Sequence, residues 1–265
     1  MASHRRLPAV FFGHGSPMNA LGGPHADAWR ALGENLPRPD AILMVSAHWE
    51  TDGYTAVTAM ERPRTIHDFG GFPRELHEVH YPAPGSPALA ERIRALPELE
   101  QVVADHAWGL DHGTWSMLLH AYPKADIPVV QLSLDRALSP REHYELGRRL
   151  RPLRDEGVLV AGSGDTVHNL RTMRRDGSND PFDWAVRFDS AVKDALLRGD
   201  HEALIGWAEM GEDARLPVPT DEHFLPLLYV AAQQDPGEPV RFFNEAIDAG
   251  SISMTGVVVG GQSLP

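Results

Sequence analysis

The stretch VFFGHGSPMNA, from Val10 to Ala20, predicts how the chain folds around its candidate site. Its first three residues are apolar and suit a short buried strand, which Gly13 ends. His14 follows at once, before the turn Gly15–Pro17, which cannot continue the strand. A histidine at the carboxyl end of a strand lies where open α/β sheets bind ligands. Taken alone, such a histidine is more often a polar loop residue beside the core.

Two more apolar runs lead to a histidine in the same way. Ala41–Ala47 (AILMVSA) is followed by His48, and a later run, VLVA, leads through GSGDTV to His168. His223 differs, because it lies in the first turn of the helix predicted for DEHFLPLLYVAAQ. If the strands are parallel, their carboxyl ends share one edge of the sheet. We therefore expect these three histidines and His14 to form one site.

The rest of the chain alternates predicted strands with predicted helices. Apolar runs indicate strands at residues 54–60 and 129–134 and in the final segments VRFFNEA and SISMTGVVVG. Helical patterns begin at Pro24, Pro87, His112, Pro140, Asp183 and His201. This alternation predicts an α/β fold: a single domain over residues 1–265, with a central, largely parallel sheet covered by helices on both faces.

Two segments need a separate interpretation. Residues 62–87 are long and irregular, and loops of this kind are usually lids or binding loops. Phe69 and Phe72 in this segment suit either a flap over a ligand or ordinary core packing. The GSGDT segment, residues 162–166, could offer backbone amides to an anion. A tight connection from strand to helix is the simpler explanation of its glycines.

Composition excludes several classes of partner. The formal net charge of −13 argues against nucleic acid, whose phosphates need clustered Lys and Arg. No apolar run approaches the roughly 20 residues that cross a bilayer, and the first residues do not resemble a secretory signal. With no cysteine there is no disulfide or thiolate metal site, so we expect a cytoplasmic protein whose metal ligands are imidazole and carboxylate.

Other catalytic signatures are absent from the sequence. There is no GxSxG elbow, no HExxH pair and no P-loop. Six further histidines lie in polar or helical contexts and are interpreted as surface or structural residues: His77, His80, His106, His120, His143 and His201.

Seven blocks of the sequence together resemble one family. They are FFGHGSPMNAL, ILMVSAHWET, IHDFGGFP, YPAPGSPALA, GLDHGTWSMLLHAYPKADIPVVQLSLD, GSGDTVHNLR and DEHFLPLLYVAA, in order from about Pro8 to Gly261. In these blocks the chain resembles the class III extradiol ring-cleavage dioxygenases, in the branch similar to DOPA 4,5-dioxygenase and in the superfamily of the protocatechuate 4,5-dioxygenase catalytic subunit. A likeness that covers nearly the whole chain is far more specific than any single motif.

The resemblance implies a role for each of five histidines. It implies that His14, His48 and His223 hold a metal, that His168 is a non-metal active-site residue, and that His112 in DHGTW lies on the substrate side. The partners it implies are a catechol and O2, and the product is a muconic semialdehyde. Some members have a histidine–proline pair before the last block, where this chain has Val218 and Pro219.

The chemistry explains why such a site needs these residues. Triplet dioxygen reacts slowly with closed-shell catechols, so a redox metal is needed, and three imidazoles on one face of Fe(II) leave positions open for catechol and O2. Proton transfer needs a base early and an acid late, which one histidine of near-neutral pKa, His168, could supply. Zn(II) binds imidazole more tightly than iron and is expected in isolated protein.

Two alternatives remain open at this stage. Three histidines with an open water position also make a zinc hydrolase site, with His168 as base. A non-catalytic metal-binding protein could use the same scaffold. Glu222 competes with His223 as third ligand, because two histidines and a carboxylate are common around non-haem iron. Arg74 and Arg171 are candidates to bind a carboxylate of the substrate.

Overall fold

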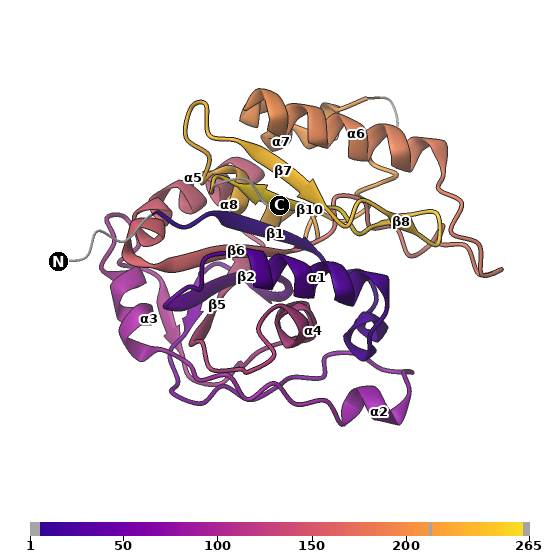
Figure 1. The fold of residues 1–265 in the computed structure, drawn as a ribbon. Coiled ribbons are helices and arrows are strands. Elements are labelled where there is room, and N and C mark those ends of the chain that lie inside the picture. The colour runs from indigo at the N-terminus through magenta and orange to yellow at the C-terminus, as the bar shows by residue number, and fades with distance from the viewer. Residues whose placement is uncertain (1–5, 212–213, 262–265) are drawn as a thin grey trace.

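One sheet organises the molecule, which is described here from a computed structural model. Within the described residues, 6–211 and 214–261, eight strands join in the order β4-β3-β5-β2-β6-β1-β10-β7 (Figure 1). Their bounds are β1 Ala9–Gly13, β2 Ala41–Thr51, β3 Ala56–Thr58, β4 Val103–Asp105, β5 Val129–Asp135, β6 Val158–Gly164, β7 Val240–Phe243 and β10 Gly256–Val259. Two short strands, β8 Ile247–Asp248 and β9 Ile252–Ser253, pair separately.

The centre of the sheet is parallel. β5, β2, β6 and β1 all run in one direction, whereas β3 is antiparallel to β5 and β10 is antiparallel to β1. The carboxyl ends of β1, β2 and β6 therefore meet at one edge. The predicted α/β fold with a mostly parallel central sheet is confirmed.

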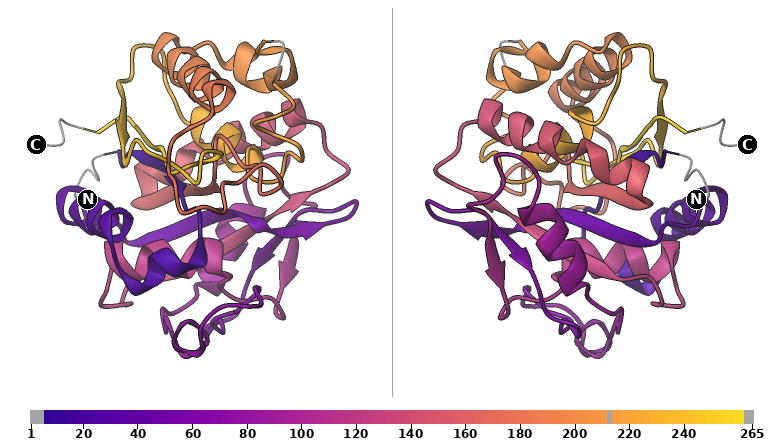
Figure 2. Two further views of the ribbon diagram at one scale, coloured as in Figure 1. Left: turned by 90° about the vertical axis from the view of Figure 1, so that its right-hand side faces the viewer. Right: turned by 90° about the vertical axis from the view of Figure 1, so that its left-hand side faces the viewer.

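Helices cover both faces of this sheet, as Figures 1 and 2 show. They are α1 Pro24–Asn35, α2 Arg74–His77, α3 Pro87–Arg94, α4 His112–Ala121, α5 Pro140–Arg149, α6 Asp183–Arg198, α7 His201–Ile205 and α8 Leu225–Ala231, with 3-10 turns η1 Pro17–Leu21, η2 Arg151–Glu156 and η3 Trp207–Glu209. None of the helices in the described part of the chain is long and apolar enough to cross a membrane.

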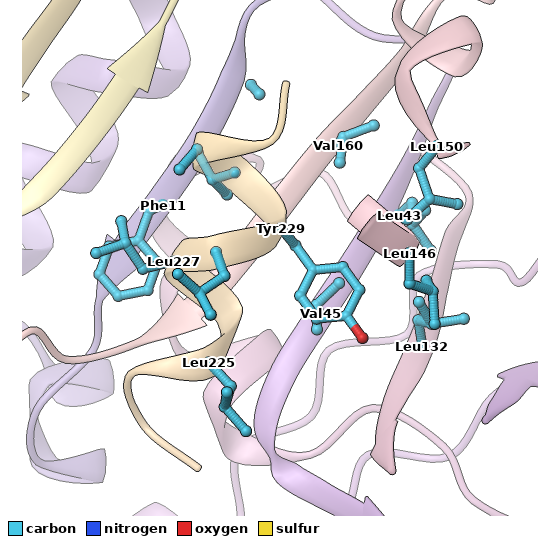
Figure 3. Close-up of a cluster of buried hydrophobic side chains, with 14 of the residues drawn as sticks. Phe11, Leu43, Val45, Leu132, Leu146, Leu150, Val160, Leu225, Leu227 and Tyr229 are labelled. Carbon is cyan, nitrogen blue, oxygen red and sulfur yellow. The ribbon is translucent and has the colours of Figure 1, made fainter. Parts of the chain in front are cut away.

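Successive side chains of each strand point to opposite faces of the sheet, so the hydrophobic core consists of two clusters, one on each face. Phe12 of β1 packs in one cluster with Trp29 of α1 and Trp115 of α4. Phe11, its neighbour, points to the opposite face and packs in a second cluster with Tyr229 of α8. Figure 3 shows this second cluster, in which α8 lies over the central strands. Because successive side chains of a strand point to opposite faces, an all-apolar strand indicates a sheet covered on both sides.

Three local expectations were wrong. The strand β2 continues to Thr51, so His48 lies inside it and not after its end, within the register shift against β5 between Val45 and Glu50. The glycines of GSGDT belong to β6 and make neither a turn nor a connection to a helix, since α6 begins only at Asp183. His223 lies in a turn two residues before α8 and not in its first turn.

Close packing explains why β6 ends in glycines. An added Cβ at Gly164 would lie 2.0 Å from the carbonyl oxygen of His223, and one at Gly162 would lie 2.6 Å from that of Pro226. Only glycine therefore lets the backbone before α8 approach this strand so closely. The glycines thus position His223 over the end of β6.

Candidate metal centre and active site

Three histidines meet at the edge where the parallel strands end. His14 directly follows β1, and its backbone N–H donates to the carbonyl of Gly164 over 3.1 Å. His48 comes from β2, and His223 from the turn before α8. One ring nitrogen of each lies within 4.8 Å of the other two, and Nε2 of His14 is 3.0 Å from Nε2 of His48. A separation near 3 Å is what two imidazoles show when they share one ion, given metal–nitrogen bonds of about 2.1 Å.

The other nitrogen of each ring faces a polar group, which forms a hydrogen bond with His14 and with His223. Nδ1 of His14 lies 2.9 Å from Oγ of Ser163, and Nδ1 of His223 donates to Oε1 of Glu222 over 3.0 Å. Nδ1 of His48 lies 3.4 Å from Oδ2 of Asp68. A carboxylate at Nδ1 keeps the proton there and leaves an unprotonated lone pair on Nε2. This is the tautomer that a metal ligand needs.

Asp68 serves two histidines, and sequence reasoning missed it. Its Oδ2 accepts from Nδ1 of His112 over 2.9 Å, and its Oδ1 accepts from the backbone N–H of His112 over 2.9 Å. Although burial raises the pKa of Asp68, the hydrogen bonds and nearby charge of His112 leave it below its usual value. The only available signal was an acidic residue inside the long irregular loop.

Burial keeps the three converging histidines neutral. It lowers the pKa of His14 and of His223 far below the usual value, and the neighbouring histidines lower both further. Burial is also the main reason that the pKa of His48 falls to about 3. Neutral imidazoles offer lone pairs at physiological pH, so no proton has to leave before a cation binds.

Asp165 adds a buried carboxyl group behind this centre, and burial raises its pKa well above the usual value. Its Oδ1 accepts from the backbone N–H of Gly15 over 3.1 Å. Its Oδ2 is buried, has no hydrogen-bond partner among the described residues, and lies 3.8 Å from Nε2 of His14. An unpartnered buried carboxylate oxygen is costly unless a positive charge compensates it. The donor set and this oxygen both fit a bound cation.

His168 lies against the same cluster but is held differently. Its ring stacks on that of His223, with centroids 3.5 Å apart and planes 9° from parallel. Its backbone N–H donates to the carbonyl of Pro217, and it pairs with Ile252 as an isolated bridge. Burial lowers the pKa of His168 to about 4, so it is neutral at pH 7. The expectation of a near-neutral pKa therefore does not hold for the free protein.

A cavity of about 510 Å³ opens beside the histidines. It is lined by His14, Gly15, Ser16, Pro17, His48, Phe69, Phe72, His112, His168, Leu170, Met173, Arg175, His223 and Ile252. Its volume is within the roughly 300–1,000 Å³ range of small-molecule sites. Phe69 lies edge-on to His112, with ring centroids 5.5 Å apart. The irregular loop thus contributes aromatic side chains both to the cavity wall and to core packing.

The remaining candidates lie elsewhere. His143 binds the hydroxyl of Tyr229 and His201 binds that of Tyr144, which agrees with structural roles. Arg74, expected as a possible carboxylate ligand, forms an exposed pair with Glu78. Neither Arg74 nor Arg171 lines the cavity, whereas Arg175 does.

Comparison with known proteins finds a family and relatives that match nearly the whole chain. Residues 11–249 match the family model described as the catalytic LigB subunit of aromatic ring-opening dioxygenase. A 4,5-DOPA dioxygenase extradiol of Escherichia coli (strain K12) is 49% identical over 263 residues, which cover 97% of this chain and 96% of that one. A protein of the same name from Beta vulgaris is 38% identical over 266 residues, 96% and 97% of the two chains.

A solved structure shares the fold. The crystal structure of an uncharacterized protein from Escherichia coli K12 matches with a TM-score of 0.84 and 45% identity, over 96% of this chain and all of that one (100%). Family match, near full-length relatives and fold agree with the resemblance seen in the sequence blocks. The chain belongs to the LigB family of aromatic ring-opening dioxygenases, in the extradiol branch that is similar to DOPA dioxygenase.

Proposed function

We propose that this chain is a non-haem iron(II) dioxygenase that opens the ring of a catechol-type substrate with O2 and yields a muconic semialdehyde. The observation that carries the proposal is the convergence of three neutral histidines beside a cavity with aromatic walls. The names of the relatives, which specify DOPA, support a catechol with a side chain. We further propose that residues 1–265 act as one catalytic domain in the cytoplasm.

The metal would be held by His14, His48 and His223. Bound Fe(II) would supply the redox chemistry that lets a catechol react with O2. Hydrogen bonds on Nδ1 orient the rings of His14 and His223 before any ion arrives, and Nδ1 of His48 faces Asp68. Zn(II) suits the same nitrogen donors, so we expect isolated protein to carry zinc unless iron is supplied.

His112 is proposed to act on the diol of the substrate. Because Asp68 accepts from its Nδ1, Nε2 of His112 is left as an acceptor for a catechol hydroxyl proton. The imidazolium that forms is stabilised by the carboxylate of Asp68, and it can then donate a hydrogen bond to the diol oxygen. Phe69 packs edge-on against the ring of His112, which is almost fully buried.

His168 is proposed as the acid–base residue of the reaction. It is neutral at pH 7, so it begins as an acceptor and becomes an acid only after it has taken a proton. The stacked ring of His223 holds its orientation.

The test is oxygen uptake by protein loaded with iron under anaerobic conditions. We expect one O2 consumed per catechol and a yellow product, with no uptake by zinc-loaded protein or by a His14→Ala variant. Hydrolysis of an ester substrate by zinc-loaded protein, without oxygen uptake by the iron form, would instead identify a zinc hydrolase. Metal binding with neither activity would leave a non-catalytic metal-binding protein.

A further inference from the structure

We infer that Arg175 binds a carboxylate on the side chain of the substrate, so that the preferred substrates are catechols with a short acidic side chain. This inference rests on the proposed function, because it names the substrate class of the same cavity. Arg175 is the one residue with a permanent charge among the described residues that line the cavity. The chain as a whole has a net charge of −13. The cavity wall differs, because within residues 6–211 and 214–261 its lining includes one arginine and no carboxylate.

The guanidinium of Arg175 is free to bind a ligand. In the described part of the chain no carboxylate or carbonyl pairs with it, although Arg175 is exposed at the cavity. Its neighbour Arg174 is occupied: Nε of Arg174 donates to the carbonyl of Asp180 over 2.8 Å, and the guanidinium lies 4.5 Å from the ring centre of Phe182. A free guanidinium matches the geometry of a carboxylate and binds it through two parallel hydrogen bonds.

The loop that carries Arg175 is tied to the rest of the protein just before it. The backbone N–H of Asn169 donates to the carbonyl of Ser251, and its side-chain amide donates to the carbonyl of Leu216. The backbone N–H of Arg174 donates to the carbonyl of Ala249 over 2.8 Å. Arg175 therefore projects from an anchored backbone, which reduces the entropy lost when it binds a ligand.

The cavity distinguishes carboxylate from ammonium. Asp68 and Glu222 lie behind the histidines, where they hold Nδ1 of His112 and of His223, and neither lines the cavity. An ammonium on the substrate thus meets one positive guanidinium and no lining carboxylate. We expect the order of kcat/KM to be a carboxylate side chain first, then a neutral one, then a cationic one.

The experiment compares three catechols that differ only in the side chain: 3,4-dihydroxyphenylpropanoate, 4-ethylcatechol and dopamine. Each is assayed by oxygen uptake with iron-loaded wild type, Arg175→Gln, Arg175→Lys and Arg171→Gln. Arg171 is the matched control, because it is an exposed arginine four residues away that does not line the cavity. Calorimetric titration of the same proteins with 3,4-dihydroxyphenylpropanoate, without O2, measures binding independently of turnover.

We expect Arg175→Gln to lower kcat/KM for the propanoate about tenfold, through KM, because a hydrogen-bonded charge pair is lost. The 4-ethylcatechol rate should not change, Arg175→Lys should recover part of the loss, and Arg171→Gln should behave as wild type. Equal loss with all three catechols, or no loss with the propanoate, would overturn the inference. If wild type opens no catechol, the proposed function fails, and the calorimetric comparison of wild type with Arg175→Gln still decides whether Arg175 binds the carboxylate.

Discussion

The role of each histidine depends on which of its two nitrogens the protein holds. Glu222 accepts from Nδ1 of His223, so the carboxylate that competed with His223 as a ligand lies behind it instead. Asp68 does the same for His112 and approaches His48. Residue type alone names the candidates, but the partner on Nδ1 determines which ring nitrogen would face a bound cation.

The first prediction separates the ligand from its support. Glu222→Gln should keep close to one equivalent of metal, because the amide oxygen of glutamine can still accept from Nδ1 of His223, with affinity lowered by about 10- to 100-fold. His223→Ala should lose most of the metal, as measured by elemental analysis of purified protein. The reverse pattern would mean a centre of two histidines and one carboxylate.

The second prediction concerns His168. His168→Ala should retain the metal while turnover falls by about 10²- to 10⁴-fold, the usual contribution of general acid–base catalysis. His168→Gln keeps polarity without a titratable proton and should not restore the rate. Recovery by glutamine would show that His168 only braces its loop, and loss of metal in either variant would make it a ligand.

At the scale of elements, the site depends on how closely the turn before α8 approaches β6. Our third prediction is that Gly164→Ala lowers both metal content and thermal stability, because its Cβ would clash with the His223 carbonyl and displace that turn. Gly70→Ala is the matched control, since its Cβ would meet nothing within 4 Å. Full metal content in Gly164→Ala would show that the turn can move without disturbing the centre.

A second link between elements is sensitive to pH. In the first turn of α1, Nδ1 of His25 lies 2.7 Å from Oδ1 of Asn244, and Nε2 lies 2.9 Å from Oδ2 of Asp248 in β8. The hydrogen bond to Asp248 is the main reason that the pKa of His25 is raised in the folded protein. The stability from this pair is therefore complete below the unfolded pKa of about 6.5 and is lost as pH rises through the folded pKa.

The fourth prediction follows from that sign. Urea unfolding should show wild type more stable than Asp248→Asn by about 0.5–1 kcal/mol at pH 5.5, the size expected of a partly exposed pair. At pH 9 the difference should shrink. A difference that is constant between the two pH values would mean that protonation of His25 does not stabilise this link.

At the scale of the whole molecule, one buried arginine joins distant parts of the chain. Nε of Arg154 donates to the carbonyl of Leu7 and Nη1 to that of Gln233, each over 2.6 Å. Its Nη2 pairs with Oε1 of Glu238, also at 2.6 Å. The guanidinium thus links the entry to β1, the end of α8 and the approach to β7, far from the histidines.

The fifth prediction is that this contact serves stability and not the site. Arg154→Met should lower the free energy of unfolding by about 3–5 kcal/mol, because Glu238 loses the charge that compensates it. The metal content of the folded fraction should not change. Arg30→Met, which removes an exposed pair with Asp27, should cost about 0–1 kcal/mol. Similar losses in the two variants, measured by urea unfolding, would contradict this account.

The sequence by itself determined the elements and the histidines that the fold brings together. Helix α1 begins at Pro24 as predicted, and the centre of the sheet is parallel as predicted. His14, His48, His168 and His223 could be named because local patterns placed each of them near the end of an apolar run or beside a helix, whereas the choice of three of them as metal ligands came from the family resemblance. Such patterns reflect hydrogen bonding and burial over a few neighbouring residues, so they can be recognised from the sequence alone.

Only the tertiary structure decided how those histidines are held and what surrounds them. Asp68 meets His112 across 44 positions of sequence, and the glycines of β6 are required by a backbone that passes over them. Local sequence does not show which of Arg171 and Arg175 lies at the cavity, whereas the structure places Arg175 in its wall and not Arg171. These contacts depend on the distances between segments far apart in the chain, so local sequence could not predict them. The pKa of His168 depends on its burial in the folded protein, so it could not be predicted from local sequence either.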